Sequence, residues 1–243
     1  EEISNFSIYG LRFNGGLTVL QTGVDGVEYH AIYIRHGSHD FTVKDIYGTR
    51  VASGVLRFRD SCYGFTAKNI EAYEADCAVI CTVGCNNFTL DNIRATSCFA
   101  EGLFLGSDIY DFSVNDVYAN VVGTVGLSIN NSYTPETRAG VRGNISNIHV
   151  LNATLQGVNL YGCDELNLSN IYVRDSNRDG VLIYGCNNIT VNNVQSWNSN
   201  RLRVTDGTSQ YMGIKVYNSR SVNLNSAICD DDGTTKYQYR GIS

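Results

Sequence analysis

Hydrophobic and polar residues alternate in short runs along the chain, and one seven-residue pattern recurs. A turn residue is followed by an apolar residue, a small polar residue, an apolar residue, a variable residue, Asn or Asp, and then Ile or Val. Copies of this heptad are DFTVKDI at 40–46, GFTAKNI at 64–70, NFTLDNI at 87–93, DFSVNDV at 111–117, ELNLSNI at 165–171 and NITVNNV at 188–194. A period of two residues predicts that each copy is a β-strand with one buried side.

Two further short runs accompany most heptads. One is Gly or Ala followed by apolar, variable and apolar residues, as in GLFL at 102–105 and GVLI at 180–183, and the other follows the heptad directly, as in IEAYE at 70–74. Three strands per repeat, with no helical period between them, predict a coil that must stack on copies of itself. The sequence therefore predicts an all-β parallel β-helix, a three-sheet solenoid.

The spacing of the heptads sets the size of this solenoid. Their Asn or Asp recurs mostly every 23 or 24 residues, which fits about nine coils in a single domain over residues 1–243. Longer steps indicate loop insertions near 130–142 and 200–212. We expect the domain to be a fragment of a longer chain.

Stacking of coils at roughly 4.8 Å turns each repeat position into a column of similar side chains. Phe41, Phe65, Phe88 and Phe112 form one inward column. Ala72, Ala95, Ala119, Val150 and Val173 form another. The Asn or Asp of each heptad is expected at a corner, where stacked amides bridge neighbouring coils.

A third column contains Cys62, Cys85, Cys163 and Cys186. Converging thiolates would suit a metal, whereas stacked cysteines in a solenoid also act as small apolar residues. We favour the second interpretation, with free buried thiols, and therefore expect folding in a reducing bacterial cytoplasm.

Charge and composition limit the partners. The net charge is −6 with no run of Lys or Arg, so neither nucleic acid nor a membrane surface is expected to bind. No apolar stretch approaches the ~20 residues of a membrane span. The four histidines lack metal-ligand spacing, and we expect no metal and no cofactor.

The repeat resembles the pectate-lyase superfamily of single-stranded right-handed parallel β-helices over essentially the whole chain. Bacteriophage tailspike and tail-fibre domains are most similar, with the closing DDDGTTKYQYRGIS as a shared feature, and mannuronan C5-epimerase modules are more distant. The resemblance implies a right-handed β-helix, a polysaccharide partner, a homotrimer, and a place in a virion tail or outside the cell. An epimerase YGFDPH-like motif is missing, because Tyr63-Gly64-Phe65 continues with Thr66-Ala67, and no G-H-G occurs.

Outward residues of the run after the heptad include aromatic and charged side chains. Tyr and Trp stack on sugar rings, and Arg bonds sugar hydroxyls. The predicted substrate-binding residues are Tyr73, Arg94, Tyr118, His149, Tyr172, Arg174 and Trp197. Alternatively, aromatic strand formers simply populate an exposed sheet or a trimer interface.

Carboxylates cluster at the next corner, and we predict Glu74, Asp76 and Glu101 as catalytic candidates. Glycoside hydrolysis uses two carboxyl groups about 5 to 9.5 Å apart, which adjacent coils would provide for Glu101 with Glu74 or Asp76. Acidic residues are also common in turns for conformational reasons alone.

Three functions remain open from the sequence. The first is a tailspike-like protein that binds and depolymerises a bacterial surface or capsular glycan, as a glycoside hydrolase or a polysaccharide lyase. The second is a non-catalytic structural spike or adhesin. The third is a lyase or epimerase of uronate polymers, for which His149, Tyr172 and Arg174 would provide the base and the cation.

Overall fold

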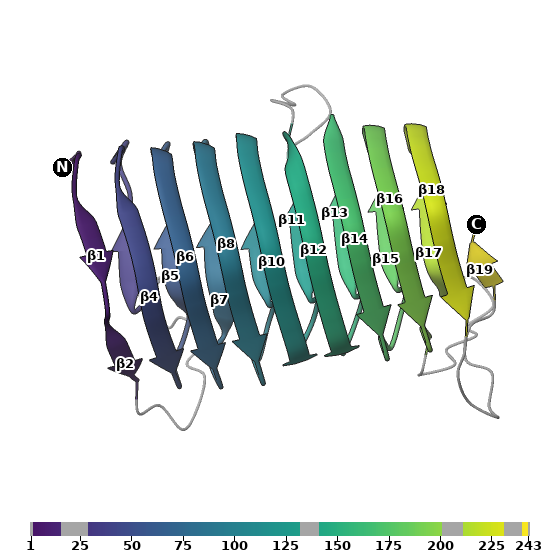
Figure 1. Ribbon diagram of the computed structural model, residues 1–243, viewed down its shortest axis with the longest axis horizontal. Helices are drawn as coiled ribbons and strands as arrows, with labels where there is room; N and C mark the ends of the chain where they lie inside the picture. Colours follow the sequence, from purple (N-terminus) through teal and green to yellow (C-terminus); the bar gives the residue numbers. More distant parts are fainter. Residues whose placement is uncertain (1, 16–28, 132–140, 201–210, 231–239, 243) are drawn as a thin grey trace.

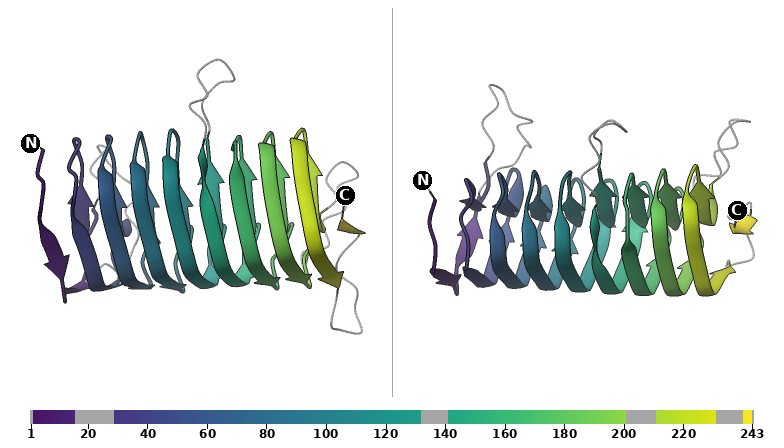
Figure 2. Two further views of the ribbon diagram at one scale, coloured as in Figure 1. Left: turned by 45° about the horizontal axis from the view of Figure 1, so that its top comes forward. Right: turned by 90° about the horizontal axis from the view of Figure 1, so that it is seen from above.

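The chain folds into two sheets of parallel strands. The sheets face each other and extend along one long axis (Figures 1 and 2). The computed structural model describes residues 2–15, 29–131, 141–200, 211–230 and 240–242. The first sheet contains β1 (Ser7–Tyr9), β2 (Arg12–Asn14), β4 (Thr42–Thr49), β6 (Tyr63–Tyr73), β8 (Asn86–Thr96), β10 (Tyr110–Val122), β12 (Arg142–Ala153), β14 (Leu166–Arg174), β16 (Asn187–Trp197) and β18 (Arg220–Asp230). The second contains β3 (Ile32–Ile34), β5 (Gly54–Phe58), β7 (Cys77–Cys81), β9 (Leu103–Leu105), β11 (Leu127–Asn130), β13 (Val158–Tyr161), β15 (Val181–Tyr184), β17 (Met212–Tyr217) and β19 (Arg240–Ile242).

From β2 onward, strands of the two sheets alternate along the chain, and every pairing is parallel, which confirms the predicted β-helix. The heptad and the run that follows it form one continuous strand with a bend, so the three predicted runs make two hydrogen-bonded sheets. We call the heptad part of these strands the first arm and the part after the bend the second arm. The right-hand view of Figure 2 shows the long strands curving round at the lower side of the molecule.

The bend lies at the Asn or Asp of the heptad. From Asp45 to Asn193 these residues have φ between 53° and 57°, the left-handed region that Asn and Asp tolerate best among residues with a side chain. The Asn69 amide donates to Asp45 Oδ1 at 2.7 Å, and the Asn92 amide donates to Asn69 Oδ1 at 2.9 Å. The predicted ladder therefore forms between side chains of neighbouring coils.

Aromatic rings fill one side of the interior. The predicted stack of Phe41, Phe65, Phe88 and Phe112 has ring centroids 4.9 to 5.3 Å apart, with planes within 11° of parallel. The stack ends at the next coil, because the position beside Phe112 is Gly143, where a Cβ would come within 2.8 Å of the Phe112 ring. The interior is thus continuous, but its filling changes at β12.

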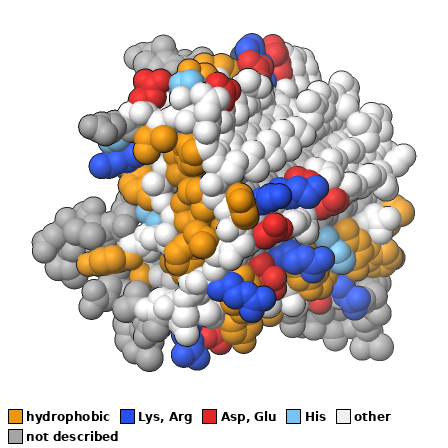
Figure 3. Space-filling view, turned by 60° about the vertical axis from the view of Figure 1, so that its left-hand side comes forward, with side chains coloured by type: hydrophobic (Ala, Val, Ile, Leu, Met, Phe, Trp, Pro, Cys, Tyr) orange, Lys and Arg blue, Asp and Glu red, His pale blue; other side chains and the backbone are white. Residues whose placement is uncertain are grey.

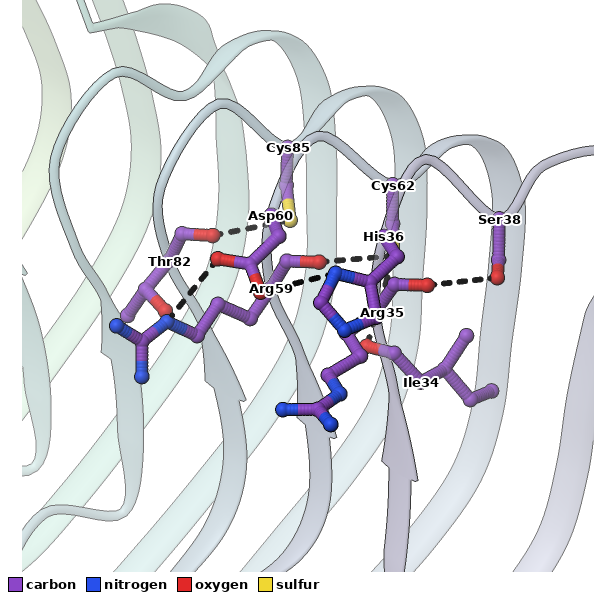
Figure 4. A network of polar contacts seen from close by, with 9 residues as sticks. All are labelled: Ile34, Arg35, His36, Ser38, Arg59, Asp60, Cys62, Thr82 and Cys85. Carbon is purple, nitrogen blue, oxygen red and sulfur yellow. Dashed lines mark hydrogen bonds and ion pairs between the residues drawn. The ribbon is translucent and has the colours of Figure 1, made fainter. Parts of the chain in front are cut away.

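The predicted cysteine column is buried and packs in a turn (Figure 4). Cys62 and Cys85 each donate from Sγ to the carbonyl oxygen three residues earlier, at 3.2 Å. The Ser38 hydroxyl makes the same contact one coil before, at 2.8 Å. Cys163 and Cys186 lie at the same corner further along the chain. A sulfur atom here does what a hydroxyl does at Ser38, which supports a structural role for the column.

The predicted loop insertions near 130–142 and 200–212 lie largely outside the described residues. In the part of the chain that the structure describes, no helix is long and apolar enough to cross a membrane.

Substitution of Asn69 tests the corner. Asn69→Ala removes both ladder hydrogen bonds and puts a residue that tolerates the left-handed backbone less well than Asn at φ 55°, so we expect a loss of about 2 to 4 kcal/mol in the free energy of unfolding. Asn69→Gly removes the same bonds without the strain, and its loss should be smaller by about 1 kcal/mol. Urea unfolding followed by circular dichroism measures both.

Asn167→Ala is the control for the Asn69 variants, because it removes one exposed amide bond to Asn144, at 3.2 Å, from an extended part of β14. Equal stabilities of the Ala and Gly variants at position 69 would contradict a role for the left-handed backbone.

Candidate functional site

The outward residues of the second arm form two columns, which together we call the outer track. The inner column contains Tyr47, Glu71, Arg94, Tyr118, His149, Tyr172 and Gln195. The outer column contains Thr49, Tyr73, Thr96, Asn120, Leu151, Arg174 and Trp197. All seven predicted substrate-binding residues thus lie on this one surface, and their binding role stays a prediction.

The centre of the outer track is a row of side chains in contact. The His149 ring meets the rings of Tyr118 and Tyr172 edge to face, with centroids 5.5 and 4.6 Å apart, and the Arg94 guanidinium lies 5.8 Å from the Tyr118 centroid. Partial burial lowers the pKa of His149 below its ordinary 6.5, so its imidazole is neutral at neutral pH. Along this row, the tyrosine rings therefore alternate with the guanidinium and imidazole groups.

The other predicted binding residues lie at opposite ends of the track. Arg174 and Trp197 are register partners on β14 and β16, and Arg174 Nε lies 3.6 Å from an oxygen of Asp175. Tyr73 is on β6, four strand spacings of ~4.8 Å from Arg174. Tyr73 and Arg174 would therefore contact different units of one long ligand.

Figure 3 shows that the surface is not uniform. A broad white face, made of backbone and of side chains that are neither hydrophobic nor charged, borders a band in which cationic, anionic and apolar side chains mix. The outward positions of the first arm include a row of hydroxyl side chains, which in register run Thr42, Thr66, Thr89 and Ser113.

Two of the three predicted catalytic residues, Asp76 and Glu101, act on each other at one corner, which we call the acidic corner. The catalytic role of all three, Glu74 included, stays a prediction. Asp76 and Glu101 occupy the turns before β7 and β9, in neighbouring coils, and burial raises the pKa of both carboxyl groups. The negative charge of Asp76 raises the pKa of Glu101 further. Glu74 is instead paired with Arg50, with Oε2 3.0 Å from Nε.

This pair has the chemistry of an acid and a base. A carboxyl group with a raised pKa retains its proton closer to neutral pH and can protonate a leaving oxygen, while a second carboxylate attacks or activates water. One coil of offset, ~4.8 Å, falls near the separation used for glycoside cleavage. Within the described ranges, no group of three or more His, Cys, Asp or Glu side chains is placed to hold a metal ion.

Asp179 is a further acid near this corner, but it is a structural residue. Its side chain is only 1% exposed, and Oδ1 accepts a hydrogen bond from the Met212 backbone N–H at 2.8 Å. Burial raises the pKa of Asp179 to about 6. A substrate has no access to this carboxyl group.

A concave surface that the sequence did not predict lies at another corner, before the first arm. A groove of about 700 Å³ is lined by Tyr110, Arg142, Asp164, Glu165, Asn187, Asn188, Arg220 and Ser221. A hollow of about 470 Å³ adjoins it and shares Arg142 and Glu165. The sequence differs from the repeat here, because GNISNI at 143–148 is one residue shorter than the heptad.

Comparisons with known proteins support the fold. No protein-family model and no curated protein sequence match the chain. The A-module of the mannuronan C-5 epimerase AlgE4 from Azotobacter vinelandii superposes with a TM-score of 0.60 at 12% identity, over 85% of this chain and 62% of that one. The catalytic domain of a GH87 alpha-1,3-glucanase variant, in complex with nigerose, gives a TM-score of 0.56 at 12% identity, over 98% of this chain and 53% of that one.

A bacteriophage CBA120 tailspike domain has a TM-score of 0.45 at 12% identity, over 93% of this chain and 35% of that one. The chain therefore spans less than two thirds of each of these proteins. The superpositions confirm that it is a right-handed parallel β-helix.

The raised pKa of Asp179 predicts a dependence of stability on pH. The Asp179 carboxyl group binds its proton more tightly in the folded state than in the unfolded state. Its favourable contribution to the free energy of unfolding is therefore complete below about pH 4 and is lost as pH rises through about 6. Asp179→Asn keeps an oxygen for the Met212 N–H and removes the titration.

We expect Asp179→Asn to raise the free energy of unfolding by on the order of 2 kcal/mol at pH 7 and to leave it nearly unchanged at pH 4. Urea unfolding at the two pH values measures this. Destabilisation at both would show that the ionised carboxylate is required.

Proposed function

We propose that the chain is a β-helix that binds and cleaves a glycan, with a bacterial surface or capsular polysaccharide as the substrate class. The observation that carries this proposal is the Asp76 and Glu101 pair at the acidic corner next to the second arm. A polysaccharide lying along the outer track would run parallel to the long axis and pass several coils. Tyr118 and Tyr172 would stack on its sugar rings, and Arg94 would bond its hydroxyl groups.

The roles of the two acids follow from their surroundings. Glu101, whose pKa is raised by both burial and the charge of Asp76, is the proton donor to the leaving glycosidic oxygen. Asp76 is the second carboxylate. The backbones of the two residues belong to neighbouring coils, ~4.8 Å apart, and this spacing allows the carboxyl separation of either a retaining or an inverting enzyme.

A second candidate is elimination from or epimerisation of a uronate polymer. The specific observation behind it is the neutral imidazole of His149, which contacts Tyr172 and lies one coil from β14, the strand of Arg174. A neutral imidazole can accept a proton, and the Arg174 guanidinium can neutralise the uronate carboxylate.

We also propose a homotrimer in a virion tail or outside the cell, folded first in the bacterial cytoplasm. The buried thiols suit folding in a reducing compartment. An outward stack of tyrosine rings lies at the C-terminal ends of β13, β15 and β17, and its members are Tyr161, Tyr184 and Tyr217. Their ring centroids are 5.0 and 5.4 Å apart, and this aromatic row suits contact with a second copy.

Sedimentation velocity tests the assembly. We expect the mass of a trimer, and a shift toward monomer for Tyr184→Ser, because the substitution removes the middle ring of the stack. A monomeric wild-type chain would contradict the proposal.

Variants of the acids test cleavage. With alpha-1,3-glucan, mannuronan and bacterial capsular polysaccharides as substrates, we expect new reducing ends from the wild type. Glu101→Gln and Asp76→Asn should slow their release by about 100-fold or more, since each removes one partner of the acid–base pair. Glu74→Gln is the matched control, because it breaks only the ion pair with Arg50, and its rate should stay within about twofold.

The products separate the candidate functions. Wild-type rates for both acid variants would reject the site. Ultraviolet absorbance of unsaturated uronates, lost in His149→Ala, would favour elimination, and nuclear magnetic resonance of an unshortened product would reveal epimerisation. Binding without any product would favour a non-catalytic adhesin.

A further inference from the structure

The groove at the corner before the first arm arises from a defect in the repeat. In most coils this corner is one left-handed residue, with φ between 49° and 63°. These residues are Asn5, Asp40, Gly64, Asn87, Asp111, Glu165, Asn188 and Ser221. In β12 the register skips this position, because Tyr110 pairs with Arg142 and Phe112 pairs with Gly143. Asp111 therefore has no counterpart in the next coil.

The missing residue leaves a notch between two intact corners. Asp111 lies on one side of it and Glu165 on the other, two coils apart, which corresponds to roughly 10 Å. Gly143 adds no side chain to fill the gap, and a Cβ there would press on the Phe112 ring. From the notch, the groove continues along this corner past Asn188 and Ser221.

Arg142 spans the notch. Its Nε and Nη2 atoms donate to the two carboxylate oxygens of Asp111 at 2.9 and 3.2 Å, and its guanidinium lies 5.7 Å from the Tyr110 ring centroid. The negative charge of Glu165 also acts on it. A guanidinium has five N–H donors, so three remain beyond the two that Asp111 accepts, on a side chain that is 51% exposed.

The lining identifies the chemistry of a ligand. Two guanidinium groups, Arg142 and Arg220, stand among three carboxylates, Asp111, Asp164 and Glu165. Asparagine amides line the remaining wall. An acidic sugar would meet an excess of carboxylates, whereas neutral hydroxyl groups can both donate to carboxylates and accept from Arg and Asn. The groove volume of about 700 Å³ suits a ligand of one or two sugar units.

On the outer track, cationic side chains outnumber anionic ones, which is the reverse of the groove. Arg94 and Arg174 outnumber Glu71 among its charged residues on the two columns. The two surfaces also belong to different arms of the bent sheet, so one sugar unit does not contact both. Their ligand preferences can therefore be separated by experiment.

We propose that the notch at β12, with Arg142, Asp111, Glu165 and Tyr110 at its centre, is a second glycan-binding site that takes neutral hexose units. The class of ligand rests on the proposed function, whereas the location rests only on the register defect and the groove. Such a site would hold the polymer at a distance from the acids that cleave it.

Isothermal titration with short neutral gluco-oligosaccharides tests the site, with mannuronate oligosaccharides as the acidic comparison. Arg142→Gln should raise the Kd for the neutral ligand about tenfold, the effect of losing hydrogen bonds from a charged donor. Glu165→Gln should act in the same direction without altering the corner, which keeps a folded variant available if Arg142→Gln unfolds.

Arg50→Gln is the matched control, since Arg50 is equally exposed, at 53%, and pairs with Glu74 through an exposed ion pair at a different corner. Its Kd should equal that of the wild type. In ¹⁵N-labelled protein, the Arg142 Nε–H resonance should shift on titration with the neutral ligand.

The outcomes separate this site from the proposed function. Unchanged Kd values for both groove variants, or resonance shifts confined to the outer track, would overturn the second site and leave glycan cleavage standing. A tenfold loss in Arg142→Gln without any glycan cleavage by the wild type would support the site and reject the proposed cleavage. Tighter binding of mannuronate than of neutral ligand at Arg142 would overturn the assigned ligand class.

Discussion

The structure depends on single residues that hold a left-handed backbone at fixed corners of each coil. One residue with φ near 55° redirects the chain without a loop, so coils without an insertion close in 23 or 24 residues and their strands meet the next coil in register. Most of these positions hold Asn, Asp or Ser. Val121 is an exception, because a β-branched side chain at φ 54° is strained. It is also exposed, so packing does not compensate directly.

Register converts repeat positions into continuous surfaces. Each outward residue has the equivalent residue of the next coil about 4.8 Å away, so a column of polar residues becomes a flat polar face and a column of aromatic and charged residues becomes a track. The same rule that builds the Phe41 to Phe112 stack inside builds the Tyr118, His149 and Tyr172 row outside. Core and candidate site are two sides of one strand.

Departures from the repeat have the opposite effect. A regular solenoid presents smooth convex corners, and a pocket needs a place where one coil differs from its neighbours. The skipped position in β12 is such a place, and it coincides with the end of the phenylalanine stack at Gly143. The acidic corner differs in another way, since Asp76 and Glu101 are partly buried instead of fully solvated.

The sequence by itself determined the coil, because a period of two within strands and of 23 or 24 between them assigns every residue to the inside or the outside. That assignment located the phenylalanine stack, the cysteine column and the outer track. It could not show that two of the three predicted runs form one bent strand, since the bend depends on a backbone angle at Asn69 and its equivalents. It also could not show the different surroundings of Glu74 and Asp76.

Only the tertiary structure decided those matters, because they depend on contacts between residues far apart in the chain. Glu74 is held by Arg50 from the preceding coil, whereas Asp76 acts on Glu101 in the following coil. Asp179 is removed from solvent by a backbone 33 residues later. The notch at Arg142 exists only in relation to the intact corners on either side, so the shortened repeat at 143–148 does not by itself predict a groove.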